Sequence, residues 1–90
     1  SYSMIKVPFD TDGGGGYEFD TRHTTRKQLT DTLDHAYKTM EWFRYLADRA
    51  TSVKVLDETF DAAEYKTRHL VCFELKPNHE TFYRLKYQDT

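Results

Sequence analysis

The sequence has very little cysteine, and it has no apolar run long enough to cross a membrane. Its one cysteine, Cys72, cannot form an internal disulfide, which excludes a disulfide framework and fits a reducing compartment. No segment approaches the roughly 20 apolar residues of a transmembrane helix, and no charged start is followed by the apolar stretch of a secretory signal. We therefore expect a cytoplasmic protein that does not enter a membrane.

The chain also lacks an excess of either charge. Lys and Arg number 13 and Asp and Glu number 15, which gives a net charge of −2. This balance excludes a protein whose whole surface is a nucleic-acid footprint, although a local basic site stays open. The 90 residues allow one small domain, residues 1–90. Ser1, Tyr2 and Ser3 precede Met4, and one interpretation is that they are added residues ahead of a native start.

Apolar residues are scarce as well, but aromatic residues are not. Only 38% of the chain is apolar, whereas 16% is aromatic, with 7 Tyr, 6 Phe and 1 Trp. The core must therefore be built largely from rings, and the Tyr hydroxyls need partners or water, which predicts half-buried tyrosines. A domain of this size has marginal stability, so association into a homodimer would help it.

The clearest periodic feature is the segment of residues 24–50. Its apolar residues recur three or four positions apart and form one seam: Leu29, Leu33, Ala36, Met40, Phe43, Ala47 and Ala50. Thr25 and Gln28 have the spacing of a capping box at its start. No glycine or proline interrupts the segment, which predicts one long amphipathic helix.

Alternating segments on both sides of this helix predict strands. Residues 3–9 form the first, residues 17–20 a short second, residues 53–60 and 65–76 the next two, and residues 81–87 the last. The fold class is therefore α+β, with one long amphipathic helix packed on an antiparallel sheet in the order β-(β)-α-β-β-β. In residues 65–76 we predict that one parity faces the core: Tyr65, Thr67, His69, Val71, Phe73 and Leu75.

No stretch of the sequence commits to a chemistry. The four glycines at 13–16 predict a flexible loop over residues 10–16, but they do not lead into a helix with the lysine of a phosphate loop. His69 and Cys72 would lie on opposite faces of a strand and cannot share a metal without a distortion such as a bulge. Asp31 and His35 lie four apart on the helix. An exposed ion pair is a simpler interpretation of this spacing than an oriented general base. We predict no catalytic residue, no metal site and no cofactor.

A basic cluster stands at the start of the predicted helix, where the helix dipole disfavours positive charge: Arg22, His23, Arg26 and Lys27. It either holds an anion or is neutralised by acidic neighbours such as Glu18 and Asp20. Three further basic residues share one parity of the predicted final hairpin and would form a stripe on its outer face: Arg68, Arg84 and Lys86. Together these residues support one hypothesis, a nucleic-acid-binding or ribonuclease-like module.

A second group on the helix lies away from its apolar seam. At about 100° per residue, five residues gather on the outer face: Trp42, Tyr45, Arg49, Lys38 and Leu46. Trp, Tyr and Arg are enriched at interface hot spots, although the first strands could instead cover Trp42 within the monomer. Our leading hypothesis is a non-enzymatic interaction or regulatory protein that binds a macromolecular partner, or itself, through this face.

Overall fold

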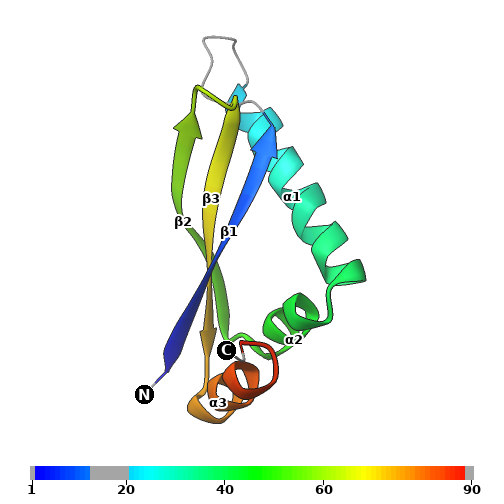
Figure 1. Cartoon of the computed structure of the whole chain (residues 1–90), viewed down its shortest axis with the longest axis vertical. Helices are drawn as coiled ribbons and strands as arrows, with labels where there is room; N and C mark the ends of the chain where they lie inside the picture. The colour runs from blue at the N-terminus through cyan, green and yellow to red at the C-terminus, as the bar shows by residue number, and fades with distance from the viewer. Residues whose placement is uncertain (1, 13–20, 89–90) are drawn as a thin grey trace.

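The computed structural model describes residues 2–12 and 21–88, with side chains for residues 2–11, 26–56 and 58–88. Over these residues the elements follow in the order β1 (Ser3–Asp12), α1 (Thr21–Thr39), α2 (Glu41–Arg49), β2 (Ser52–Asp61), β3 (Lys66–Leu75) and α3 (Pro77–Lys86) (Figure 1). This arrangement confirms the predicted α+β class. None of the helices described is long and apolar enough to span a membrane.

The sheet is antiparallel and has β3 at its centre. The strand order is β1-β3-β2, so the first and second strands of the chain both pair with the third. The pairing of β1 with β3 runs without interruption from Ser3 opposite Leu75 to Asp12 opposite Lys66. The register of β2 shifts between Val55 and Asp57, which marks a bulge. Because β1 and β2 run parallel with β3 between them, α1 and α2 form the connection of a split β-α-β unit.

One face of the sheet, here called the inner face, packs against the helices. Five β3 residues point into this core and are buried: Thr67, His69, Val71, Phe73 and Leu75. They confirm the predicted parity, except that Tyr65 lies in the turn before β3, has a φ of 54° and is 61% exposed. The core is built largely from rings, as predicted: Phe43 makes edge contacts with Phe9 and Phe73, each at 5.5 Å between centroids.

The single long helix of the prediction is wrong, because the chain bends at Met40. Helix α1 ends at Thr39, Met40 is extended with φ −118° and ψ 114°, and α2 begins at Glu41. A straight helix over residues 24–50 would be about 40 Å long, more than the roughly 33 Å of a ten-residue strand. The bend instead returns Phe43 and Leu46 to the core. Across it, the Tyr37 hydroxyl donates a hydrogen bond of 2.7 Å to Asp48.

The predicted final strand, residues 81–87, is also wrong, because this segment is helical. Helix α3 begins with Pro77 at its first position, where the missing amide hydrogen costs nothing. Glu80 in the first turn and Arg84 and Lys86 in the last turn complement the helix dipole. The predicted short strand, residues 17–20, lies outside the described residues, as do residues 13–16 of the predicted loop, whereas residues 10–12 belong to β1.

Candidate functional site

Helices α2 and α3 lie next to each other at the end of the sheet where β3 runs into α3 (Figure 1), and their aromatic rings are in contact. Tyr45 of α2 is at the centre of this group. Its ring stacks on Phe82 with centroids 5.1 Å apart and an interplanar angle of 22°, and its centroid lies 5.8 Å from that of Tyr87. It also stacks on the buried Tyr83, at 6.4 Å. The rings therefore join two helices that are separated in the chain by β2 and β3.

Two cations lie over these rings. The guanidinium carbon of Arg49 is 4.7 Å from the centroid of Tyr45. The Lys86 Nζ atom is 5.6 Å from the centroid of Phe82 and 5.4 Å from that of Tyr87. Such contacts contribute about 0.5–1 kcal/mol each at exposed sites. We call the rings, the two cations and the neighbouring Leu85 of α3 the α2–α3 aromatic surface. Its members are Tyr45, Arg49, Phe82, Leu85, Lys86 and Tyr87.

Helix α3 exposes apolar side chains on this surface. Phe82 is 47% exposed, and Leu85, three residues further along the same helix face, is 75% exposed. No other large apolar side chain that the structure describes is as exposed as Leu85. Tyr45 and Tyr87 are half-buried and pack against the main core, and Phe82 stacks on Tyr45. The surface is therefore a small apolar patch with cations attached to its rings.

The structure separates the residues of the predicted outer helix face. Tyr45 and Arg49 belong to the α2–α3 aromatic surface, and Lys38 is exposed in the last turn of α1. Trp42 is half-buried with its ring edge-on to Phe43, and Leu46 is completely buried in the core. The predicted face assumed one straight helix, and the bend at Met40 turns α2 relative to α1.

The predicted basic stripe is not formed, because its residues lie at opposite ends of the sheet. Arg68 is near the start of β3, whereas Arg84 and Lys86 are on α3, beyond the end of that strand. Arg84 pairs with Glu80 and donates a hydrogen bond of 2.7 Å to Gln88, and Lys86 Nζ lies 3.7 Å from a Glu41 carboxylate oxygen. These cations are largely paired within the chain.

The basic helix start is described only in part. Arg26 and Lys27 are exposed, and Lys27 pairs with Asp31 at 3.1 Å. The side chains of Arg22 and His23 lie outside the described set, as do Glu18 and Asp20, which were predicted to neutralise them. The choice between an anion site and internal neutralisation therefore stays a prediction.

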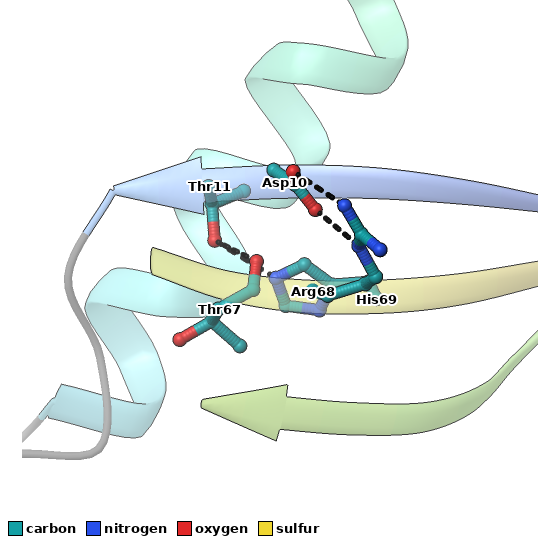
Figure 2. A network of polar contacts seen from close by, with 5 residues as sticks. All are labelled: Asp10, Thr11, Thr67, Arg68 and His69. Carbon is teal, nitrogen blue, oxygen red and sulfur yellow. Dashed lines mark hydrogen bonds and ion pairs between the residues drawn. The ribbon is translucent and has the colours of Figure 1, made fainter. Parts of the chain in front are cut away.

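Arg68 belongs instead to a polar network across the other end of the sheet (Figure 2). Its guanidinium donates two hydrogen bonds, of 2.9 and 3.1 Å, to the two carboxylate oxygens of Asp10. This contact lowers the pKa of the Asp10 carboxyl, because the hydrogen bonds and the positive charge favour its ionised form. The pair joins β1 to β3 on the outer face of the sheet, the face away from the helices.

The inner face at this end carries a buried hydroxyl and a buried imidazole beside an exposed carboxylate. Thr11 Oγ1 lies 2.9 Å from Nε2 of His69 and 3.4 Å from the Thr67 carbonyl oxygen, to which it donates (Figure 2). On the other side of the ring, His69 Nδ1 is 3.4 Å from Glu58 Oε1 but makes no hydrogen bond. The order suggests a nucleophile, a base and an orienting acid. Thr11 and His69 are buried, however, so the hydrogen bonds of Thr11 serve to hold β1 against β3.

Sequence reasoning missed half of the α2–α3 aromatic surface. Phe82, Leu85 and Tyr87 were assigned to a strand, although Pro77 followed by Glu80 was a usable signal for a helix start. In the described part of the chain, no group of three or more His, Cys, Asp or Glu side chains is placed to hold a metal ion. Comparisons of the chain with protein-family models, with curated proteins and with solved structures find no match.

Proposed function

We propose that this chain is a non-enzymatic interaction protein that binds a protein partner through the α2–α3 aromatic surface. The observation that carries the proposal is the exposed pair Phe82 and Leu85, held in place by the stacking of Phe82 on Tyr45. Exposed apolar groups on a rigid element cost solubility, and contiguous groups of them mark interaction sites. Tyr and Arg beside them are residue types that dominate binding energy at interfaces.

The cations of this surface indicate the chemistry of the partner. Lys86 already lies beside Glu41 and Arg84 is paired with Glu80, so Arg49, over the Tyr45 ring, is the cation of this surface that the described residues leave available to a partner. A partner that combines apolar side chains with nearby carboxylates would complement both features. Charge at the rim chiefly raises the association rate and rejects basic partners, so we expect binding to weaken with salt without being lost.

The arrangement of the rings favours a protein partner over nucleic acid. Single-stranded nucleic acid binds by stacking its bases on open ring faces. Here Tyr45 already carries Phe82 stacked on it and the Arg49 guanidinium over it, so little of its face is free. The most exposed large apolar side chain that the structure describes is the aliphatic Leu85, which offers no face for stacking.

Site-specific crosslinking tests this proposal. A photoreactive amino acid at position 85 should capture a protein in cells of the source organism, whereas the same group at Tyr65, at the far end of the sheet, should not capture it. The captured protein is then purified, and its affinity for the wild type is compared with that for Phe82→Ser/Leu85→Ser and for the control Tyr65→Asn.

We expect the double variant to bind at least about tenfold more weakly, corresponding to about 1.4 kcal/mol, and the control to bind as the wild type does. Equal affinity of all three proteins would contradict the proposal. Capture of RNA or DNA in place of protein at position 85 would favour the nucleic-acid hypothesis instead.

A further inference from the structure

The edge strand β2 is the least covered part of the sheet. Its backbone pairs with β3 on one side, and on the other side the structure places no strand among the described residues. The main packing contacts of α1 are with β1 and α2, and those of α2 with the sheet are with β3, so the helical layer stops short of β2. Val53, Val55 and Leu56 are accordingly 50%, 44% and 46% exposed.

Contrast with the neighbouring strand shows how unusual this exposure is. Val53 lies opposite Phe73 and Val55 opposite Val71, and both β3 residues are buried. Two adjacent strands thus present apolar side chains to the same inner face, and only one of them is covered. The other edge differs: β1 has α1 packed along it and carries Pro8, which has no amide hydrogen to offer to a further strand.

The bulge in β2 changes which residues face inward. Before the bulge the odd-numbered Val53 and Val55 lie opposite inner-face residues of β3, and after it the even-numbered Glu58 and Phe60 do. If two β2 strands pair antiparallel over all ten residues, Ser52 lies opposite Asp61, and each odd-numbered residue meets an even-numbered one. In regular strands this register would join opposite faces. The bulge makes the faces match, with Val53 opposite Phe60 and Val55 opposite Glu58.

Charge favours the same register. The first half of β2 carries a positive charge at the exposed Lys54, and the second half carries negative charge at Glu58 and Asp61. Antiparallel pairing places Lys54 opposite Thr59 of the second copy and diagonal to its Asp61 on the same face, a distance that long side chains span. Two-fold symmetry makes this contact twice. Parallel pairing would place equal charges side by side.

From these observations we propose that a second copy of this chain binds along β2, so that two antiparallel β2 strands join the sheets of two protomers into one. The contact is isologous and closes as a dimer, with the unpaired backbone groups of both strands satisfied by each other. Val53 of each copy then packs against Phe60 of the other on the inner face. This site is separate from the α2–α3 aromatic surface and does not depend on the function proposed for that surface.

Charge reversal with a built-in control tests the proposal. Lys54 and Lys6 lie in one row of the outer face, on either side of Cys72, and both are exposed. Sedimentation equilibrium over a wide concentration range should show a wild-type dimer. Lys54→Glu should raise its dissociation constant at least about tenfold, because the new carboxylate faces Asp61 of the second copy. Lys6→Glu should leave the dissociation constant unchanged.

A compensating variant distinguishes loss of the contact between the two copies from a local disruption of β2 by the Lys54→Glu substitution. Lys54→Glu/Thr59→Lys restores opposite charges across the proposed contact and should recover the wild-type dissociation constant, with circular dichroism confirming that all variants are folded. A wild type that is monomeric at every concentration would overturn the proposal, as would a dimer that Lys54→Glu and Lys6→Glu weaken equally. Phe82→Ser/Leu85→Ser should remain dimeric, and loss of the dimer in that variant would place the contact on α3 instead.

Discussion

The Thr11 hydroxyl and the His69 imidazole meet inside the protein, with Oγ1 and Nε2 2.9 Å apart and both side chains buried. They come from β1 and β3, at positions separated by 58 residues. Since a buried ring nitrogen has no water to replace a lost partner, the imidazole depends on this hydroxyl.

Replacing Thr11 by Val should therefore destabilise the fold by about 1–3 kcal/mol, the usual result of leaving a buried polar atom unpaired. Val keeps nearly the same shape, so little of the effect comes from packing. Thr11→Ser keeps the hydroxyl and serves as the control. Urea unfolding of the three proteins measures the difference, and equal losses in the two variants would show that the hydroxyl does not support His69.

The Asp10–Arg68 pair should give a pH dependence of known sign. Because Arg68 lowers the pKa of Asp10, the ion pair stabilises the fold fully above the unfolded pKa of Asp, about 3.9, and this contribution is lost as the pH falls through the lower folded pKa. The difference in free energy of unfolding between the wild type and Arg68→Gln should thus be constant near neutral pH and should disappear in acid. Asp10→Asn should show the same closure, and a gap that persists in acid would assign the effect of Arg68 to packing.

Leu46 and Leu85 offer the same substitution in opposite environments. Leu46→Ala removes a completely buried side chain and should lower the free energy of unfolding by about 2–5 kcal/mol. Leu85→Ala, at a side chain that is 75% exposed, should change it by no more than about 0.5 kcal/mol. Thermal or urea unfolding at one fixed protein concentration compares them. A similar decrease in the free energy of unfolding for both variants would mean that the Leu85 side chain is buried in solution.

A double-mutant cycle should measure the link between α2 and α3. The stacked geometry of Tyr45 and Phe82 predicts a coupling of about 0.5–1.5 kcal/mol between Tyr45→Leu and Phe82→Leu in unfolding experiments. Tyr65→Leu, in the turn before β3, should instead be additive with Phe82→Leu within about 0.5 kcal/mol. A Tyr45–Phe82 cycle that is also additive would show that the two rings do not support one another.

The sheet was the part of the fold that sequence reasoning predicted best. In β3 a two-residue period ran over the whole strand, and burial on one side enforces such a period strongly. The bend at Met40 gave no comparable signal, because neither glycine nor proline marks it and the apolar seam continues through it. Its cause is tertiary: α2 must turn to bring Phe43 and Leu46 onto the sheet.

The C-terminal segment shows why periodicity alone can mislead. Tyr83, Leu85 and Tyr87 alternate as in a strand, but Tyr83 and Tyr87 are also four apart, as on one face of a helix. A seven-residue window satisfied both periods, and only the helix start signals at Pro77 and Glu80, which the strand prediction did not use, distinguish them. The same error hid Phe82 and Leu85 from the list of site residues, whereas Tyr45 and Arg49 were found because their residue types are typical of interfaces.

The central position of β3 governs when this protein can fold. Strand β1 pairs with β3 at sequence separations as large as that between Ser3 and Leu75, and β2 pairs with β3 as well. During synthesis, neither edge strand has a partner until residues 66–75 have left the ribosome. Strand β1 therefore stays unpaired, with its apolar side chains exposed, until β3 is available. Helices α1 and α2 need only local contacts and form much faster than this long-range pairing. We therefore expect the sheet to form only after β3 has been synthesised, so that products truncated before Leu75 cannot form it and are open to aggregation.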